Sequence, residues 1–203
     1  MPAPDELRLT ALVLAAGSSR RLGRPKQLLA FRGATLLDAT ISTVLGFGFA
    51  QTIVTVGGAE AEVRRTVDLS GVEVVDSVHH TDGCSSSIVS ALDVVDAAAD
   101  GFLLFLGDQP DVPRGAVEAL AAAAADGAEI AVVDYRDGTG HPFWFARSTF
   151  DALGGLHGDK AVWKLLESGR FAARHVTVDR EAPLDVDTWD DYQRLLAADG
   201  ASG

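Results

Sequence analysis

The stretch that decides the fold is TALVLAAGSSRRLGRPK, residues 10–26. Its first part, TALVLAA, is a continuous apolar run, which is typical of a strand buried on both faces of a parallel sheet. Its second part, GSSRRLGRPK, carries three arginines and one lysine but no acid. Backbone N–H groups near glycine can approach an anion closely, and the cations add opposite charge. We therefore expect a strand that ends in a phosphate-binding loop.

The charge pattern around this loop favours an anion site. The 203-residue protein has a net charge of −12, yet no Asp or Glu occurs from Leu7 to Leu37, where six basic residues lie. Such a segment repels itself unless an anion neutralises it. The alternatives are a basic surface segment or a turn whose glycines serve geometry alone. The acidity of the whole protein gives no indication of a nucleic-acid or membrane surface.

Length and composition predict one domain over residues 1–203 with a frayed tail at 199–203. A single cysteine excludes an internal disulfide framework. The apolar run is too short to span a bilayer, and Asp5 and Glu6 precede it, where a signal peptide carries positive charge. We expect a cytoplasmic protein.

Predicted strands and helices alternate along the sequence. Strands are expected at 10–16, 52–58, 72–77, 101–110 (with a sharp end), 128–135 and 141–146, and helices at 34–45, 85–99, 116–125, 161–168 and 187–196. Asp187 is expected to cap the last helix. This order predicts an α/β fold with a doubly wound, mostly parallel sheet in a three-layer, Rossmann-like sandwich. Ligands of such sheets bind at the carboxyl ends of the strands.

A metal site is predicted in the segment GDQP, residues 107–110. Asp108 follows an apolar strand, so its carboxylate projects from a rigid element. Magnesium is held in proteins by one or two such carboxylates together with phosphate oxygens, and it neutralises charge during phosphoryl chemistry. A turn-initiating aspartate is the alternative. Asp111 is expected only to serve the N-terminus of the next helix.

The segment LAAGSSRRLGRPK, residues 14–26, resembles the L-x-A-G-x-S-x-R-[ML]-G-x-x-K signature of nucleotidyltransferases with a glycosyltransferase-A-like fold. With GRPKQLL it is similar to the molybdenum cofactor cytidylyltransferase branch. The resemblance implies that Arg21 and Lys26 stabilise departing pyrophosphate. Guanine-preferring members carry LAGG, so Ala16 favours cytosine. Nucleotide-binding residues implied in this way are Leu14, Ala15, Ala16, Gly17, Ser18, Ser19, Gly23, Ser85, Ser86 and Gly107.

Two segments imply further site residues. LDVDTWDDYQRL, residues 184–195, resembles the element D-I-D-T-P-E-D-L and implies a second metal ligand. Asp185 and Asp187 alternate along an extended stretch and point to opposite sides, so one would face the metal while the other caps the helix. Asp187 is the preferred ligand, with Asp185 as the alternative. Asp190 and Asp191 are expected to interact with the helix dipole.

Elements in the middle of the sequence resemble the base and acceptor sites of the same family. GCSSSIVSAL, residues 83–92, is similar to G-M-S-S-S-L and implies cytidine contacts, although these serines could also cap the helix. The segment 137–166 resembles G-H-P-x-x-F and L-x-G-D-x-G-A-R, which places His141 and Asp159 at the acceptor. Residues 160–163, KAVW, depart from the expected glycine and arginine and leave the acceptor open.

The resemblance implies a Mg²⁺-dependent enzyme that transfers CMP from CTP to a phosphorylated acceptor, molybdopterin, and releases pyrophosphate. It divides the protein into a nucleotide-binding half, about 7–110, and an acceptor-binding half, about 111–198, and it implies a molybdoenzyme client. One alternative is the same chemistry with GTP or another nucleotide and a sugar or polyol phosphate. Another is a nucleotide- or cofactor-binding regulator or chaperone without turnover. A glycosyltransferase would need the motif D-x-D at the end of a central strand, which the spacing DQPD does not provide.

Overall fold

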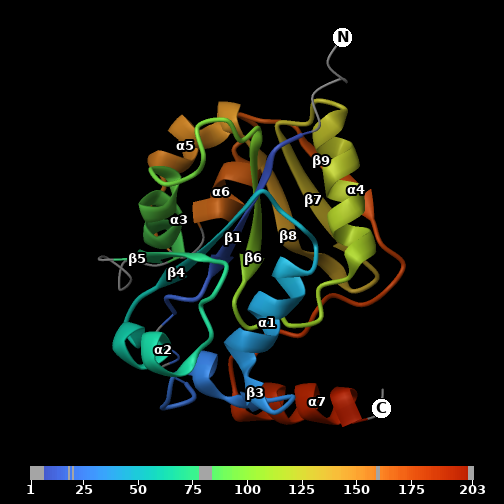
Figure 1. Ribbon diagram of the computed structural model, residues 1–203. Coiled ribbons are helices and arrows are strands. Elements are labelled where there is room, and N and C mark those ends of the chain that lie inside the picture. Colours follow the sequence, from blue (N-terminus) through green and yellow to red (C-terminus); the bar gives the residue numbers. More distant parts are fainter. Residues whose placement is uncertain (1–6, 18, 20, 78–83, 159–160, 201–203) are drawn as a thin grey trace.

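The computed structural model describes residues 7–17, 19, 21–77, 84–158 and 161–200 (Figure 1). Its main strands are β1 (Leu9–Leu14), β4 (Gln51–Val56), β5 (Glu73–Asp76), β6 (Gly101–Leu106), β7 (Ile130–Tyr135), β8 (Gly138–Ala146) and β9 (Ala173–Thr177). They form one sheet in the order β5-β4-β1-β6-β8-β7-β9. Only β8 among them runs antiparallel to its neighbours β6 and β7. The expected doubly wound, mostly parallel sheet is therefore confirmed.

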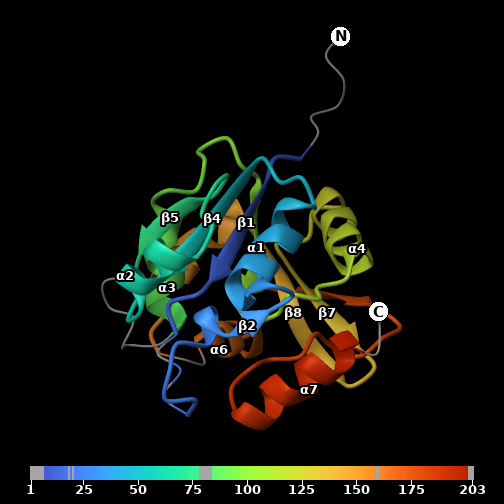
Figure 2. The ribbon, with the colours of Figure 1, turned by 60° about the horizontal axis from the view of Figure 1, so that its bottom comes forward.

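Helices cover both faces of this sheet. They are α1 (Leu36–Leu45), α2 (Glu60–Thr66), α3 (Cys84–Leu92), α4 (Arg114–Ala125), α5 (Phe150–Gly154), α6 (Ala161–Glu167) and α7 (Trp189–Gly200). In β1, Ala11 and Val13 pack into the apolar cluster under α1, α2 and α4, whereas Leu12 packs under α3, α5 and α6. This alternation explains why the strand is apolar at consecutive positions. Three layers result, as Figures 1 and 2 show.

A small hairpin and the last helix form an extension beside the sheet. Strands β2 (Ala30–Phe31) and β3 (Ala34–Thr35) pair with each other and precede α1. The predicted helix at 34–45 therefore begins two residues late, where Thr35 and Asp38 form a capping box. Helix α7 lies against this hairpin in both ribbon views. A third apolar cluster joins them, made of Leu22, Leu29, Phe31, Leu36, Val186, Tyr192 and Leu195.

Polar contacts reinforce the docking of α7. The Tyr192 hydroxyl donates to the Ala30 carbonyl oxygen at 2.5 Å. Arg32 pairs with Asp199 on α7 at 2.6 Å and with Asp111 at 2.9 Å. Asp111 thus binds a side chain of the hairpin and does more than serve the N-terminus of α4. In the part of the protein that the structure describes, no helix is long and apolar enough to cross a membrane.

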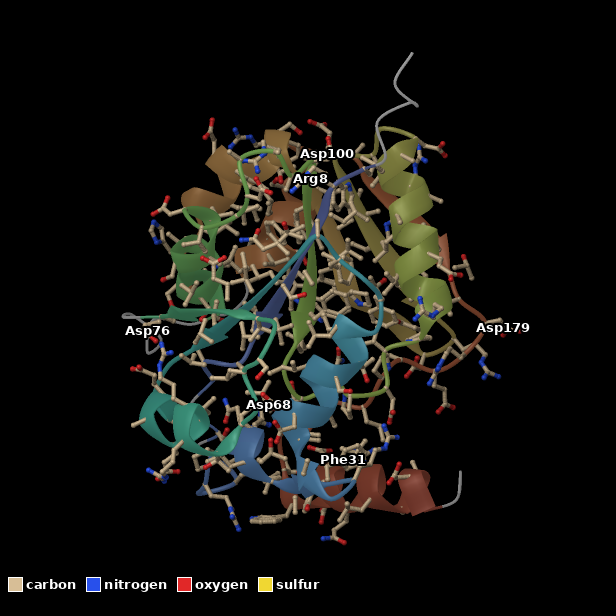
Figure 3. All side chains as sticks on the ribbon, in the orientation of Figure 1. Arg8, Phe31, Asp68, Asp76, Asp100 and Asp179 are labelled. Carbon is tan, nitrogen blue, oxygen red and sulfur yellow. The ribbon has the colours of Figure 1, made fainter. Side chains whose placement is uncertain are left out.

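Two of the six basic residues near the N-terminus stabilise the fold. The backbone N–H of Arg8 donates to Asp100 at 2.8 Å, and its guanidinium pairs with Asp96 at 2.7 Å. Figure 3 shows Arg8 and Asp100 together at the end of the sheet away from Phe31 and α7. Arg32 is bound to the two acids named above. Neither residue belongs to the anion site that the one-sided charge predicts.

Candidate active site

Two loops that leave parallel strands meet at one edge of the sheet. β1 and β6 pair in register over their whole length, so the segments that follow them begin side by side. Gly107 makes this possible, because a Cβ there would lie 3.0 Å from both the Ala15 Cβ and the Leu14 carbonyl oxygen. A larger residue would push the loops apart. The glycine before Asp108 therefore serves the close approach of the two loops.

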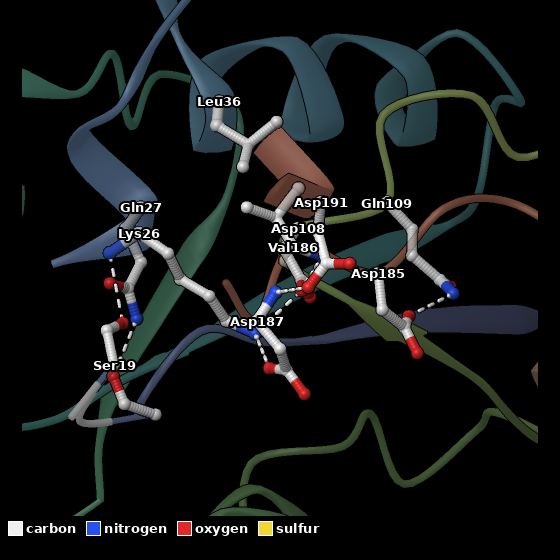
Figure 4. Close-up of polar contacts among 12 residues, drawn as sticks. Ser19, Lys26, Gln27, Leu36, Asp108, Gln109, Asp185, Val186, Asp187 and Asp191 are labelled. Carbon is white, nitrogen blue, oxygen red and sulfur yellow. Dashed lines mark hydrogen bonds and ion pairs between the residues drawn. The ribbon is translucent and has the colours of Figure 1, made fainter. Parts of the chain in front are cut away.

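Lys26 lies at the centre of the charged groups (Figure 4). Its Nζ is 2.6 Å from Asp108 Oδ2 and 3.2 Å from Asp187 Oδ1. Lys26 begins the short 3₁₀ helix η1 (Lys26–Leu28), Asp108 follows β6, and Asp187 precedes α7. The fold thus brings together three residues from distant parts of the sequence.

Arg21 joins this cluster at its exposed side. Its Nη2 lies 2.7 Å from Asp187 Oδ2, so Asp187 bridges the two cations that the sequence assigns to phosphate. Both side chains of this pair are largely exposed. An exposed pair contributes roughly 0–1 kcal/mol. An incoming anion can therefore replace Asp187 as the partner of Arg21 with little loss of free energy.

Asp108 is the buried member of the cluster. Its side chain is 5% exposed, and its Oδ2 also accepts the backbone N–H of Val186 at 2.9 Å. For Lys26, burial disfavours the charged ammonium, but Asp108 and Asp187 together hold its pKa above the ordinary value. Lys26 therefore stays charged, and the carboxylates attract other cations to the same place.

Asp185 lies next to this cluster but has a different partner. Its Oδ1 accepts a hydrogen bond from Gln109 Nε2 at 2.6 Å. Desolvation by the surrounding protein and then the charge of Asp108 raise the pKa of Asp185 to about 6, although the residue keeps an open side toward solvent. Of the two candidate metal ligands, Asp187 is the one that pairs with the Lys26 ammonium, which lies between Asp187 and Asp108.

The cap of α7 is neither of these aspartates. Thr188 Oγ1 accepts the backbone N–H of Asp191 at 3.2 Å, and Asp191 Oδ2 accepts the backbone N–H of Thr188 at 2.7 Å. This reciprocal pair is a capping box with an acid three residues after the cap. The expectation that Asp187 or Asp185 caps the helix is therefore wrong. The side chains of Asp185 and Asp187 are therefore available to the site, whereas Asp191 is part of the cap.

The loop after β1 is fixed by its own hydrogen bonds. The Lys26 backbone N–H donates to Ser19 Oγ at 3.0 Å. Ser19 and Gly23 have φ of 47° and 68°, a left-handed conformation that glycine adopts without strain. Gly17 is exposed, and a Cβ there would meet nothing within 4 Å, so the loop has open space beside it. Ser18 lies outside the described residues.

Two buried glutamines take part in the site and were not recognised in the sequence. Gln27 and Gln109 directly follow Lys26 and Asp108 and are each 3% exposed. Buried glutamine is uncommon, and each here comes straight after a charged residue of the site. That repeated order was the only sequence signal that could have identified them.

The carboxylates fit a divalent metal ion. Asp108 and Asp187 supply oxygen ligands and already lie around one cation, the Lys26 ammonium. No group of three or more His, Cys, Asp or Glu side chains that could hold a metal occurs among the described residues. Magnesium and similar ions use one or two carboxylates together with substrate phosphates. The two carboxylates therefore suit a metal whose remaining ligands are water or the phosphates of a bound substrate.

The predicted base-contacting serines begin α3. The helix starts at Cys84, so Ser85 and Ser86 lie in its first turn and not at a cap position before it. Ser85 is buried, and Ser86 Oγ lies 3.3 Å from Ser77 Oγ at the end of β5. The helix contacts β1, β4 and β5, and so stands on the same half of the sheet as the loop after β1.

His141 occupies the start of β8, and Asp159, the other predicted acceptor residue, lies outside the described residues. The His141 ring stacks on Phe143, with centroids 4.2 Å apart and planes 27° apart. Trp163 of α6 meets Phe143 edge-on at 5.4 Å and is 38% exposed. Because β8 runs against β6, His141 lies toward the carboxyl end of β6, where Asp108 follows.

The environment of His141 predicts a pH dependence of stability. Desolvation lowers its pKa from 6.5 to about 4, so between these values the unfolded protein binds the proton and the folded protein does not. The free energy of unfolding should therefore fall as the pH is lowered from 6.5 to 4. In His141→Phe this contribution should be missing, which urea denaturation at several pH values would measure. An unchanged slope in the variant would contradict the prediction.

Comparison with known proteins identifies a family to which the sequence is similar. The family described as MobA-like NTP transferase domain matches residues 11–177. The purine catabolism protein PucB of Bacillus subtilis (strain 168) is 26% identical over 94% of this chain and 97% of its own length. The family match includes residues 17–26 and Asp108, while Asp187 lies beyond it.

Two solved structures are similar over nearly the whole length. The rv0371c homologue from Mycobacterium sp. strain JC1 is 50% identical, covers 97% of this chain and 98% of its own, and superposes with a TM-score of 0.90. Rv0371c from Mycobacterium tuberculosis H37Rv, in a structure described as a complex with manganese, is 46% identical with a TM-score of 0.84. It covers 94% of this chain and 99% of its own.

Proposed function

The chain belongs to the family of MobA-like NTP transferase domains and is a nucleotidyltransferase, and on this premise we propose that it transfers CMP from CTP to a phosphorylated acceptor of the molybdopterin type. The observation that carries the proposal is the position of Lys26 between Asp108 and Asp187, with Arg21 on Asp187. Groups that bind phosphate and groups that bind metal thus share one place, as transfer from a triphosphate requires.

The residues of the cluster have distinct tasks in this reaction. Asp108 and Asp187 would hold Mg²⁺ or Mn²⁺, which when bound supplies charge neutralisation. The loop around Gly17 binds the triphosphate through backbone N–H groups. Lys26 and Arg21 then contact the β- and γ-phosphates and stabilise negative charge on the pyrophosphate as it leaves.

The chemistry needs positioning more than a covalent enzyme intermediate. A phosphate oxygen of the acceptor attacks the α-phosphorus of CTP in line, and the bond to the bridging oxygen of pyrophosphate breaks. The aromatic row of His141, Phe143 and Trp163 lies at the same end of the sheet. Phe143 is fully buried, and the partly exposed Trp163 supports an acceptor with a planar ring, such as a pterin, since a ring can pack on its indole.

The preference for cytosine rests on the resemblance of LAAG to the cytidylyltransferase branch. The manganese complex of the similar Rv0371c supports a divalent metal. A cytoplasmic location belongs to the same proposal, because the single cysteine leaves no internal disulfide to need an oxidising compartment. A molybdoenzyme that receives the product is the partner that this acceptor implies.

Calorimetry with CTP and GTP, each with Mg²⁺, tests the base. We expect CTP to bind at least about tenfold more tightly, the equivalent of one good hydrogen bond to a base edge. Ala16→Gly should reduce the difference between the affinities for CTP and GTP while leaving the affinity for tripolyphosphate unchanged. Release of pyrophosphate from CTP in the presence of molybdopterin then tests the acceptor. Equal or reversed affinities for the two nucleotides would overturn the cytidylyl assignment.

A further inference from the structure

Gln27 holds the backbone of the phosphate loop from its buried side. Its Nε2 donates to the Ala15 carbonyl oxygen at 2.6 Å and to the Gly17 carbonyl oxygen at 3.0 Å. Lys26 and Gln27 are consecutive residues of a 3₁₀ helix, in which successive side chains point about 120° apart. One therefore reaches the acids while the other reaches the loop, as Figure 4 shows.

The direction of these two bonds matters for anion binding. In a trans peptide the C=O and the following N–H point to opposite sides. When Gln27 draws the Ala15 carbonyl inward, the N–H of Ala16 must point the other way. The same amide also keeps two carbonyl oxygens, which would repel phosphate, turned away from it. Gln27 thus determines which edge of the loop backbone an anion meets.

Gln109 makes an equivalent pair of bonds to the acidic segment. Its Nε2 donates to Asp185 Oδ1 at 2.6 Å (Figure 4). It also donates to the Pro183 carbonyl oxygen at 3.2 Å. The neighbouring Asp108 accepts the Val186 N–H, so residues 183–186 are bound to the end of β6. Asp187 follows directly. Its position opposite Lys26 therefore depends on this attachment.

Both glutamines leave their side-chain oxygen buried without a hydrogen-bond partner among the described residues. A buried unsatisfied oxygen costs free energy, which an apolar side chain of similar size would avoid. An apolar side chain would, however, also remove the donor to two acceptor oxygens, so the unpaired side-chain oxygen does not explain why an amide stands at either position. The donor nitrogen, with its two acceptors, accounts for it at both.

We propose that Gln27 and Gln109 are positioning residues, Gln27 for the phosphate-binding loop and Gln109 for the metal-binding acids. This inference rests on the proposed places of phosphate and metal, but not on the base or the acceptor. The phosphate-binding loop and the metal-binding acids are thus each positioned by a different glutamine, and each glutamine can be substituted without the other. Loss of one should impair one ligand and spare the other.

Gln27→Met keeps the size of the side chain and removes the donor. We expect its affinity for inorganic tripolyphosphate, measured by calorimetry without metal, to fall about tenfold. Its affinity for Mn²⁺ alone, measured by electron paramagnetic resonance, should stay within about twofold of wild type. Gln109→Met should show the reverse, with weakened Mn²⁺ binding and unchanged tripolyphosphate binding.

Gln51 provides a matched control for a merely structural role. It also donates twice through Nε2, to the Val94 carbonyl oxygen at 2.8 Å and to Glu73 at 2.7 Å, but at the amino end of β4. Gln51→Met should lower the melting temperature and leave both affinities unchanged. If Gln27→Met and Gln109→Met behave like Gln51→Met, the inference is wrong.

Further variants and probes separate the possible failures. Should a methionine variant not fold, Gln27→Leu or Gln109→Leu removes the donor with a different neutral side chain, and the same pattern of one weakened and one unchanged affinity is expected. Wild-type protein that binds tripolyphosphate and Mn²⁺ but prefers GTP would overturn only the cytidylyl proposal. Wild-type protein that binds neither probe would overturn the inference together with the proposed site.

Discussion

Asp108→Asn should reduce kcat for pyrophosphate release by about a thousandfold, because a metal-held charge supplies several kcal/mol to such a transition state. The substitution keeps the size of the side chain and removes its charge. The triphosphate should still bind through the loop and its cations. The measurement is a coupled pyrophosphate assay beside nucleotide calorimetry on the same variant.

Asp111→Asn is the matched control for this prediction. Asp111 is on the same loop but pairs with Arg32, away from Lys26. It should retain close to the wild-type rate. Pyrophosphate release that survives Asp108→Asn would show that Asp108 does not hold a required metal. Nucleotide binding without turnover in the wild type would instead favour the regulator or chaperone alternative.

Lys26→Met should impair both stability and catalysis. The Lys26 side chain is 19% exposed and that of Asp108 is 5% exposed, so the variant leaves a buried carboxylate without its cation. Breaking such a pair lowers the free energy of unfolding by about 3 kcal/mol. Loss of one charged donor to the leaving group should also lower kcat by about a hundredfold.

Metal provides an internal check on this variant. Mn²⁺ brings positive charge to the acids that Lys26 has left, so it should raise the melting temperature of Lys26→Met more than that of wild type. Lys164→Met, on the exposed side of α6, is the control and should match wild type in stability and rate. A Lys26→Met protein as stable as wild type would mean that Lys26 does not compensate Asp108.

The central sheet could be predicted from the sequence because its strands are apolar on both faces. Runs such as TALVLAA and GFLLFL indicate buried strands, and the loops after them lie where ligands bind. The reversed direction of β8 could not be predicted in this way, because an apolar run carries no direction. The short edge strand β9 was missed because ARHVT alternates only weakly and is half exposed.

Prediction was weaker where side chains choose between competing partners. Asp185, Asp187 and Thr188 all precede α7 and could each cap it by residue type. Thr188 is the cap because Asp191, three residues later, completes the capping box with it. Asp187 is not the cap because its side chain pairs with Lys26, 161 residues before it in the sequence. The two glutamines were missed because their acceptors are oxygens of remote segments, which no local pattern reveals.

The docking of α7 has a consequence for the order in which the protein becomes active. Arg21 and Asp187 are 166 residues apart in sequence, and the third apolar cluster closes the same long loop. Contacts of such separation form late, after local helices and neighbouring strands, because closing a long loop costs entropy. Because Asp187 follows every strand of the sheet in the sequence, the charged cluster can be completed only after all the strands have been synthesised. Turnover, in contrast to helix content, reports that folding has reached its last step.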